Sequence, residues 1–438
     1  MGGGDHAIRV CETCGQYQAT IRVERTKGDR MKALDEARAE VLSVMPKLPV
    51  AKVRLTESLG RVTAEDAVVR EALPPFDNSA MDGYAVMASD VEATPVELSV
   101  NEDVAAGSVP TKRVEQGTAT RIMTGAPMPL GADTVVKVED TESTDPERVT
   151  IRKTSVSGQN VRPVGCDMAR GDIIVEKGVR LTSRHLASLA SAGVDPVVSA
   201  MPRVAIMSTG DEIVDPSTES LAWGTIRDSN RVLLRSLLAD LGVPVVDLGI
   251  IGDDPEALRT AYAEAASSAD VVISTGGVSM GDYDYVKQIL GELGSVDFWK
   301  VAMQPGKPFA FGSIHGVPLF GLPGNPVSTF VSFEQFVRPA LLHMMGALKL
   351  LRTRVNGTIG EDVDTNEAKT VFLRVLLAHD TDGSFVAVQS GGQGSAMHSS
   401  LAKADAFAVV PAGTGSLSAG DDVTLEMFRW PEGRSIDE

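Results

Sequence analysis

Strand-like and helix-like segments alternate along residues 202–346, and this alternation constrains the fold more than any other feature of the sequence. Apolar runs such as 203–208 and 270–275 are typical of buried strands, and the segments between such runs place apolar residues at helical spacing. This pattern favours a parallel sheet with helices on both faces. Towards the end of the region, residues 309–324 predict a strand hairpin and residues 326–346 predict a helix.

The segments before and after this region differ in composition, and the differences suggest separate domains. Short β-prone runs separated by Gly, Pro and Asp make residues 74–155 β-rich, whereas residues 29–73 and 156–200 are mixed. We therefore predict a composite linker domain built from the two mixed segments, with the β-rich domain inserted in it. An α/β domain over 201–347 and a small β-barrel over 348–438 complete the predicted multidomain fold of α/β plus β type.

Two helices are predicted within the mixed segments. Residues 29–45 repeat apolar side chains on one helical face, and residues 183–193 form a short helix that Gly193 closes. The apolar face of the first helix comprises Leu34, Ala37, Val41 and Val44.

Residues 1–28 differ from the rest of the chain. They are rich in glycine at the start and polar after it, and they carry Cys11 and Cys14 with His6 nearby. A closed structural zinc site needs four ligands, so we interpret this segment as a tail outside the fold. A metal site shared by two chains is the alternative. The third cysteine, Cys166, is expected to be a buried apolar side chain.

Charge and cysteine content exclude several classes of protein. The 41 basic and 59 acidic residues give a net charge of −18, whereas nucleic-acid binding needs a basic surface. An anionic ligand would therefore need a local basic pocket. No run of about 18 apolar residues marks a transmembrane helix, and the N-terminus lacks the apolar core of a signal peptide. Three cysteines cannot form a disulfide framework, so we expect a protein of the reducing cytoplasm.

Polar or glycine-rich turns are predicted at the carboxyl ends of four strands in the α/β region. Ligands of open parallel sheets bind at this edge, where the N-terminus of each following helix offers N–H donors suited to phosphate. A single turn of this kind also has steric explanations, but four at one edge favour a phosphate-bearing ligand. Neither a P-loop nor a dinucleotide G-x-G-x-x-G motif is present. The four turns span 208–212, 252–255, 274–284 and 321–328.

Acidic side chains gather in the same turns. A structural role explains two of these acids without a ligand. Asp254 would be the N-cap of the helix that begins at Pro255, and Asp211 would be a turn or cap residue. Oxygen ligands beside a phosphate are typical of Mg²⁺ rather than Zn²⁺. The remaining acids are less well explained by capping or turns, and they are therefore the candidate magnesium ligands: Glu212, Asp228, Asp253 and Asp284.

Basic and mixed turns add further candidates. Lys300 and Lys307 flank one loop and could supply positive charge to a phosphate or oxyanion, with solvent exposure alone as the alternative. Three turns earlier in the chain combine polar groups with Pro, Gly or apolar side chains, as the walls of ligand sites do. These turns span 74–86, 124–129 and 160–167.

Taken together, these motifs resemble one family, the molybdopterin molybdenumtransferases of the bacterial MoeA and gephyrin E-domain type. The resemblance extends over about residues 30–430, and the motifs occur in the order of the family. It rests on FDNSAMDGYAV (76–86), RIMTGAPMP (121–129), STGDE (208–212), RDSN (227–230), DDP (253–255), STGGVSMGDYDYVK (274–287), WKVAMQPGKP (299–308) and GLPGNPVS (321–328).

The resemblance implies an L-shaped subunit that forms a homodimer, with an active site in a cleft between subunits. The composite domain would serve dimerisation, and the α/β domain would bind molybdopterin. Members of the family insert molybdate into the dithiolene of adenylylated molybdopterin and release AMP with Mg²⁺. Contact with the molybdopterin adenylyltransferase that supplies this substrate is a further expectation. The alternatives are a scaffold or carrier that only binds pterin, and a tungstate-specific homologue.

Matched motif by motif, the resemblance assigns catalytic roles to Asp82, Glu212, Asp253, Asp284 and Lys300. From the barrel, Arg374, Ser395 and Ser399 would complete an anion pocket. Gln304 stands where some members have a second lysine, and it can still donate to an oxyanion. The remaining expected substrate contacts are Thr124, Asp167, Ser208, Thr209, Gly210, Asp228, Asn230, Gly276, Gly277, Ser279, Gln304, Lys307, Pro323, Gly324, Asn325 and Ser328.

Overall fold

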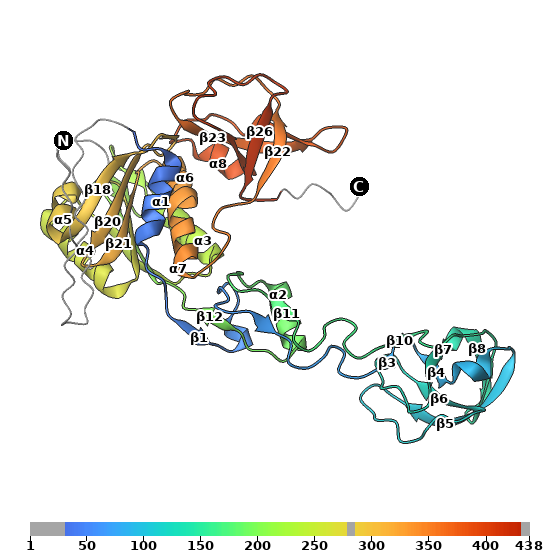
Figure 1. The fold of residues 1–438 in the computed structure, drawn as a ribbon. Coiled ribbons are helices and arrows are strands. Elements are labelled where there is room, and N and C mark those ends of the chain that lie inside the picture. The colour runs from blue at the N-terminus through green and yellow to red at the C-terminus, as the bar shows by residue number, and fades with distance from the viewer. Residues whose placement is uncertain (1–30, 278–284, 431–438) are drawn as a thin grey trace, which may run out of the picture.

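The chain forms an elongated, angled molecule in which one domain lies far from the others (Figure 1). The computed structural model describes residues 31–277 and 285–430. The α/β domain and the C-terminal barrel lie together at one end, the inserted β-rich domain lies at the other, and the composite domain connects them. This is the multidomain architecture that the sequence predicts, while the residue boundaries between its parts stay predictions.

A six-stranded sheet forms the centre of the α/β domain. Four neighbouring strands are parallel, as predicted, and the two at one edge are antiparallel. The predicted hairpin reverses the chain through His315 and Gly316, whose φ angles of 46° and 82° suit the tight turns of hairpins. In spatial order the strands are β16 (Val245–Ile251), β13 (Val204–Thr209), β17 (Val271–Thr275), β21 (Val317–Leu322), β20 (Pro308–Ile314) and β18 (Gly294–Lys300).

Helices cover both faces of this sheet because its strands are apolar on both sides. On β13, Val204 and Ile206 pack into one core, and Ala205 and Met207 pack into the other. None of the helices in the described ranges is long and apolar enough to cross a membrane. The first face is covered by α1 (Leu34–Val44), α3 (Asn230–Asp240), α6 (Pro326–Ser332) and α7 (Arg338–Met344), and the second by α4 (Pro255–Ser268) and α5 (Tyr285–Leu293).

The helix predicted over 29–45 is α1, and its buried face differs from the prediction at the last position. Leu34, Ala37 and Val41 are buried as predicted, but Val44 is 44% exposed. The helix ends at Val44, and the extended backbone of the next residue turns the side chain of Met45 into the core instead.

Two predicted helix boundaries are confirmed. The N–H of Ala257 donates to the Asp254 carboxylate at 2.8 Å, and Pro255 is the first residue of α4. The helix α2 (Ser183–Ser191) ends just before Gly193, whose φ of 61° is the left-handed conformation that closes many helices.

The inserted domain contains a second six-stranded sheet, and the composite domain contains only short pairings. The inserted strands are, in spatial order, β7 (Thr134–Lys137), β4 (Gly83–Val86), β6 (Thr118–Ile122), β5 (Val96–Val104), β9 (Arg148–Ile151) and β8 (Thr141–Asp145). In the composite domain and at its junction, β1 (Val50–Lys52) pairs with β12 (Val197–Ser199), β2 (Ala67–Val68) with β11 (Ile173–Val175), and β3 (Asn78–Ser79) with β10 (Val161–Arg162). Single turns of 3₁₀ helix span Leu55–Glu57, Ala88–Val91 and Val138–Asp140.

The C-terminal region is a closed five-stranded barrel, as predicted. It closes because β23 pairs with both β24 and β25. The short strand β19 (Met303–Gln304) of the α/β domain pairs with β23, so the loop between the two candidate lysines lies against the barrel. The barrel contains β22 (Arg354–Ile359), β23 (Thr370–His379), β24 (Phe385–Gln389), β25 (Ala406–Val410), β26 (Asp422–Met427) and the helix α8 (His398–Lys403).

Candidate functional site

The ends of β13 and β17 carry buried hydroxyl groups that bond to each other. Ser208 Oγ donates to Asp228 Oδ1 at 3.0 Å and lies 3.1 Å from Thr275 Oγ1. Thr209 Oγ1 donates to the Thr275 carbonyl at 3.3 Å. Because these side chains are buried and bonded within the protein, Ser208 and Thr209 fix the two strand ends relative to each other. They therefore hold the turns of the site in place and do not face a ligand.

Asp228 has a structural role that its sequence context did not suggest. Its Oδ1 accepts the backbone N–H of Arg231 at 3.0 Å, and its Oδ2 pairs with Arg231 Nε at 3.1 Å. The carboxylate is only 2% exposed, so Arg231 neutralises it and both oxygens are engaged. Asp228 therefore anchors the start of α3, and a metal ion would have to displace the guanidinium to bind it. The arginine three residues further on was the available sequence signal.

The glycines at this edge have reasons within the protein itself, which are packing at Gly276 and Gly277 and a φ of 138° at Gly210. A Cβ on Gly276, whose φ is 94°, would lie 2.5 Å from the Thr209 carbonyl oxygen. One on Gly277 would lie 2.5 Å from the Val286 side chain, and one on Gly210 would lie 2.4 Å from the Glu212 carboxylate. These contacts give the turns a steric reason for glycine, separate from the approach of a ligand.

Two exposed carboxylates lie on turns that contact each other. The carboxylate of Asp211 accepts the backbone N–H of Asp253 at 3.0 Å, which confirms the predicted turn role of Asp211. This bond brings the turn of Glu212 beside the turn of Asp253. Both Glu212 and Asp253 are exposed, and neither carboxylate accepts a hydrogen bond from any described residue. Among the described residues of this edge, these two carboxylates remain available to a ligand.

The turn after β21 is held by both neighbouring elements. Asn230 Nδ2, at the start of α3, donates to the Gly324 carbonyl at 2.7 Å. Asn325 Nδ2 donates to Ser395 Oγ of the barrel at 2.9 Å, and the Val327 N–H donates to the Ser395 carbonyl at 3.2 Å. The structure thus brings these predicted residues together. One backbone N–H at the start of α6, that of Val327, is already bonded to the barrel. Pro323 lies in the same turn, and Ser328 is buried in the first turn of α6.

Arg374 is buried behind the predicted anion pocket. Its Nε donates to Ser400 Oγ at 2.9 Å and its Nη2 to the Gly392 carbonyl at 2.8 Å. Its Nη1 has no partner among the described residues, and burial lowers the pKa of Arg374 to about 10. Arg374 thus supports the barrel segment that carries Ser395, and it does not lie at the surface. Ser399, by contrast, is exposed.

The sheet register places the lysine loop at the same edge as these turns. Lys300 is opposite Pro308, and β20 continues from there to pair with β21, whose carboxyl end precedes Pro323. The loop is closed by a 2.8 Å bond from the Val301 N–H to the Lys307 carbonyl. Lys307 and Gln304 are exposed, and Lys300 is partly exposed. The basic side chains therefore lie at the edge that carries the acidic ones.

The predicted residues of the inserted domain form a separate group. Asp82 Oδ1 accepts the Thr124 backbone N–H at 2.7 Å and the Thr124 hydroxyl at 2.9 Å, and these bonds hold the pKa of Asp82 below its ordinary value. Asp167 lies on a neighbouring exposed turn, and its N–H donates to the Leu73 carbonyl. The composite domain separates this group from the strand edge within one chain (Figure 1).

One correction and several untested residues remain. Cys166 is exposed, so its interpretation as a buried apolar side chain is wrong. Its neighbours Val164 and Asp167 in the turn 160–167 are exposed as well. Ser279 and Asp284 lie outside the described residues, as do His6, Cys11 and Cys14. Among the described residues, no three His, Cys, Asp or Glu side chains are grouped as a metal site would need.

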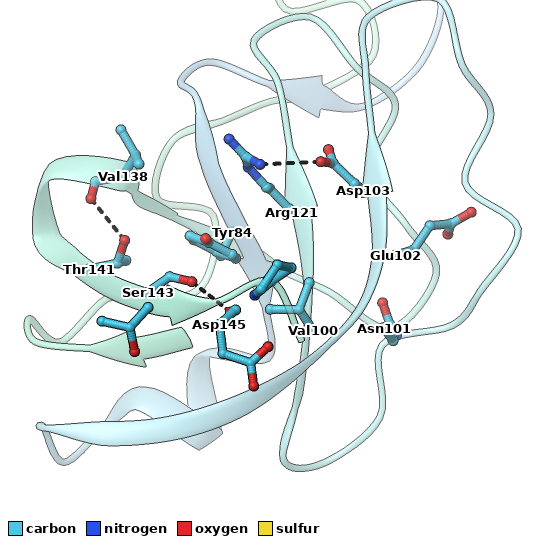
Figure 2. Close-up of a pocket in the computed structure, with 12 residues that line it drawn as sticks. Tyr84, Val100, Asn101, Glu102, Asp103, Arg121, Val138, Thr141, Ser143 and Asp145 are labelled. Atoms are coloured by element: carbon cyan, nitrogen blue, oxygen red, sulfur yellow. Dashed lines mark hydrogen bonds and ion pairs between the residues drawn. The ribbon is translucent and has the colours of Figure 1, made fainter. Parts of the chain in front are cut away.

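One cavity lies on the inserted domain, and another lies beside the lysine loop. The first, of about 630 Å³, opens on the inserted sheet and includes one residue of the predicted turn 74–86; Figure 2 shows that its Arg121 and Asp103 pair with each other. Its lining includes Tyr84, Val100 and Asp145. A second, of about 210 Å³, lies where Gln304 meets the barrel. Since the lining of the first cavity is confined to the inserted domain and includes none of Glu212, Asp253 and the lysine loop, the strand edge remains the better candidate site.

Comparisons with known proteins agree with this arrangement. Models of the MoeA N-terminal region (domains I and II), the probable molybdopterin binding domain and the MoeA C-terminal region (domain IV) match residues 32–193, 205–343 and 356–428. A molybdopterin molybdenumtransferase of Haemophilus influenzae is 36% identical over 91% of this chain and 99% of its own length. Molybdopterin molybdenumtransferase 2 of Mycobacterium tuberculosis is 38% identical over 80% of this chain and 88% of its own. The crystal structure of a molybdopterin biosynthesis MoeA protein from Pyrococcus horikoshii is 34% identical, with a TM-score of 0.74 over 92% of this chain and all of that one.

Proposed function

Because the chain belongs to the molybdopterin molybdenumtransferase family, we propose that it inserts molybdate into adenylylated molybdopterin and releases AMP, producing molybdenum cofactor. The observation that carries this proposal is the grouping of Glu212, Asp253 and the Lys300–Lys307 loop at one strand edge. Acidic and basic groups along the same edge of one sheet suit an extended substrate that combines a pyrophosphate with an incoming oxyanion. The proposal places the reaction in the cytoplasm, where the cysteines stay reduced.

The basic side chains would bind the anionic parts of the substrate. An ammonium group donates charge-assisted hydrogen bonds to phosphate or molybdate oxygens, and Lys300 and Lys307 offer two of these groups. Gln304, exposed between them, would add a neutral donor. The buried hydroxyls of Ser208 and Thr209 would act indirectly, by keeping the turns of Gly210 and Gly276 in place.

The described carboxylates fit a magnesium ion that is shared with phosphate. Mg²⁺ in phosphoryl-transfer sites is usually held by one or two carboxylates, substrate phosphate oxygens and water. Glu212 and Asp253 supply two such carboxylates on contacting turns, and Asp284 remains a further proposed ligand. The ion would neutralise charge on the phosphates as AMP leaves. Asp228 is engaged with Arg231, so we propose it as a support for the site and not as a ligand.

We also propose that the active site is completed by a second chain. Asp82, Thr124 and Asp167 cannot act on a substrate at the strand edge of their own chain, because the composite domain lies between them. In a symmetric dimer, the inserted domain of one chain could face the edge of its partner. Asp82, whose pKa the bonds from Thr124 lower, would then orient water or a substrate group.

The test is incubation of the purified chain with adenylylated molybdopterin, molybdate and Mg²⁺, followed by measurement of AMP. We expect AMP release that needs molybdate and stops when EDTA removes the metal. Tungstate in place of molybdate tests the metal preference. Binding of the substrate without AMP release would contradict the proposal and would indicate a pterin-binding carrier.

A further inference from the structure

The segment before α1 lies along the start of the lysine loop. The Lys32 N–H donates to the Lys300 carbonyl at 2.8 Å, and the Ala302 N–H donates to the Lys32 carbonyl at 2.8 Å. These two bonds form a parallel bridge between Lys32 and Val301. Lys32 therefore holds the peptide groups on both sides of Val301, the residue that directly follows Lys300.

The peptide that links Lys300 to Val301 is bonded in two directions. Its N–H donates to the Lys307 carbonyl at 2.8 Å, and its carbonyl accepts the N–H of Lys32. The first bond closes the hairpin between the two candidate lysines, and the second joins that hairpin to the segment before α1. Since β18 is the last strand of the described sheet on this side, the bond from Lys32 takes the place of a neighbouring strand at Lys300.

The side chain of Lys32 is held in place as well. Its ammonium lies 3.7 Å from the centroid of the Trp299 ring and pairs with the Glu40 carboxylate of α1 at 2.5 Å. Because the Lys32 side chain is only 22% exposed, both interactions are partly shielded from water, which strengthens them. Lys32 thereby connects α1, through Glu40, to the residue that directly precedes Lys300.

Trp299 connects this contact to the core of the α/β domain. The centroid of its ring lies 5.8 Å from that of Phe309 and 5.7 Å from that of Phe311, and both phenylalanines are buried. The indole is therefore fixed by the core, and the ammonium of Lys32 packs on it. The chain is thus held at Trp299 and at Val301, so the backbone of Lys300 between them has little freedom.

We propose that Lys32 is a positioning residue for Lys300. Its side chain, fixed on Trp299 and Glu40, keeps its backbone bonded to the loop, and the loop then presents the Lys300 ammonium to the anionic part of the substrate. A binding group that is held in place beforehand loses less conformational freedom when the ligand arrives, so affinity is higher. This inference rests on the proposed function, in which Lys300 binds phosphate or molybdate oxygens.

Hydrogen exchange followed by mass spectrometry tests the loop without any substrate. Lys32→Met removes the ion pair and the cation–π contact, and we expect the backbone amides of 300–304 to exchange about three- to tenfold faster. Lys32→Arg keeps a cation over the ring and should restore the original rate. The matched control is Lys287→Met, because the Lys287 ammonium lies 5.5 Å from the ring centroid of Phe298 on the same strand. Unchanged exchange in Lys32→Met, or an equal increase in Lys287→Met, would overturn the proposal.

Calorimetric titration with adenylylated molybdopterin shows whether Lys32 acts through Lys300. Lys32→Met should raise the dissociation constant about three- to tenfold in the otherwise unmodified chain, and should leave it unchanged in a chain that already carries Lys300→Ala. An effect that bypasses Lys300, such as a general distortion of the site, would weaken binding equally in both chains and would overturn the proposal. If the unmodified chain does not bind the substrate, the proposed function fails, and the exchange rates alone decide whether Lys32 fixes the loop.

Discussion

At the scale of single residues, two residues that are adjacent in the sequence can have different structural roles. Asp253 and Asp254 are adjacent, yet Asp254 caps α4 and Asp253 presents a carboxylate with no partner among the described residues. Asp228 looked like a third free acid but is bound to Arg231. Residue type and spacing predict which side chains gather at the strand edge. They do not predict which of those side chains are already paired, because the pairing depends on how the turns fold back.

The two adjacent acids make a matched pair of variants. We expect Asp253→Asn to abolish AMP release while leaving the thermal unfolding midpoint unchanged. Asp254→Ala should do the opposite, costing about 1 kcal/mol of stability through the lost N-cap and leaving AMP release intact. Unfolding scans and AMP assays on both proteins check this. Full activity in Asp253→Asn would exclude the proposed role of its carboxylate.

Lys300 should contribute to affinity for the anionic substrate. Replacement by alanine removes a charge-assisted hydrogen bond, which is worth about 1.5–3 kcal/mol, and Lys300→Arg should restore only part of it. Calorimetric titration with adenylylated molybdopterin measures the difference. Lys349→Ala, at an exposed lysine outside the site, is the control. An affinity unchanged from the starting protein in Lys300→Ala would refute this role.

At the scale of elements, most strands and helices follow from hydrophobic periodicity. The β-rich regions predicted over 74–155 and 348–438 form the inserted sheet and the barrel, because short β-prone runs separated by turn residues reflect local burial. The short pairing of β14 (Ile213–Val214) with β15 (Ile226–Arg227) and the π-helical turn Phe333–Val337 were not predicted. Both depend on contacts distant in sequence. The π-helical turn carries Gln335, which bonds to Arg38 of α1 and to Glu426 of the barrel.

These buried hydrogen bonds should hold together α1, the π-helical turn and strand β26 of the barrel. Glu426, 3% exposed, accepts from Gln335 and from Arg354, so Glu426→Ala leaves both donors without their acceptor. Leaving the buried amide of Gln335 without its acceptor typically costs about 1–3 kcal/mol, whereas Arg354, 46% exposed, remains solvated. Urea unfolding measures the loss. Glu97→Ala, which breaks the exposed pair with Arg148, should cost less than about 1 kcal/mol. Equal losses of stability in the two variants would show that the buried hydrogen bonds of Glu426 stabilise the fold no more than an exposed ion pair does.

At the scale of the whole molecule, sequence motifs identify the parts of the site but not their separation. The motifs of the inserted domain and of the α/β domain point to one ligand, yet Figure 1 places them at opposite ends of one chain. Spacing along a chain carries no information about this distance, because the composite domain between them is assembled from two segments far apart in sequence. Only the resemblance to a known family suggested that two chains share a site.

The N-terminal extension should be dispensable for the assembled molecule. Residues 1–28 precede the described fold, and the cysteines and histidine there are fewer than a closed zinc site needs. We expect a chain that lacks them to keep its dimer mass and its AMP release. Sedimentation, the AMP assay and metal analysis of the full chain test this. Stoichiometric zinc in the full chain, together with loss of the dimer on truncation, would show that two chains share a metal there.

Complementation between two inactive variants tests the shared site most directly. Asp82→Asn and Asp253→Asn chains, each expected to be inactive alone, would be co-expressed so that mixed dimers form. If each site combines Asp82 of one chain with Asp253 of the other, every mixed dimer contains one intact site. Random pairing in a symmetric dimer then predicts recovery of about a quarter of the AMP release of the unmodified protein. Mixed dimers that form and release no AMP would contradict the account, because both residues would then have to act within one chain.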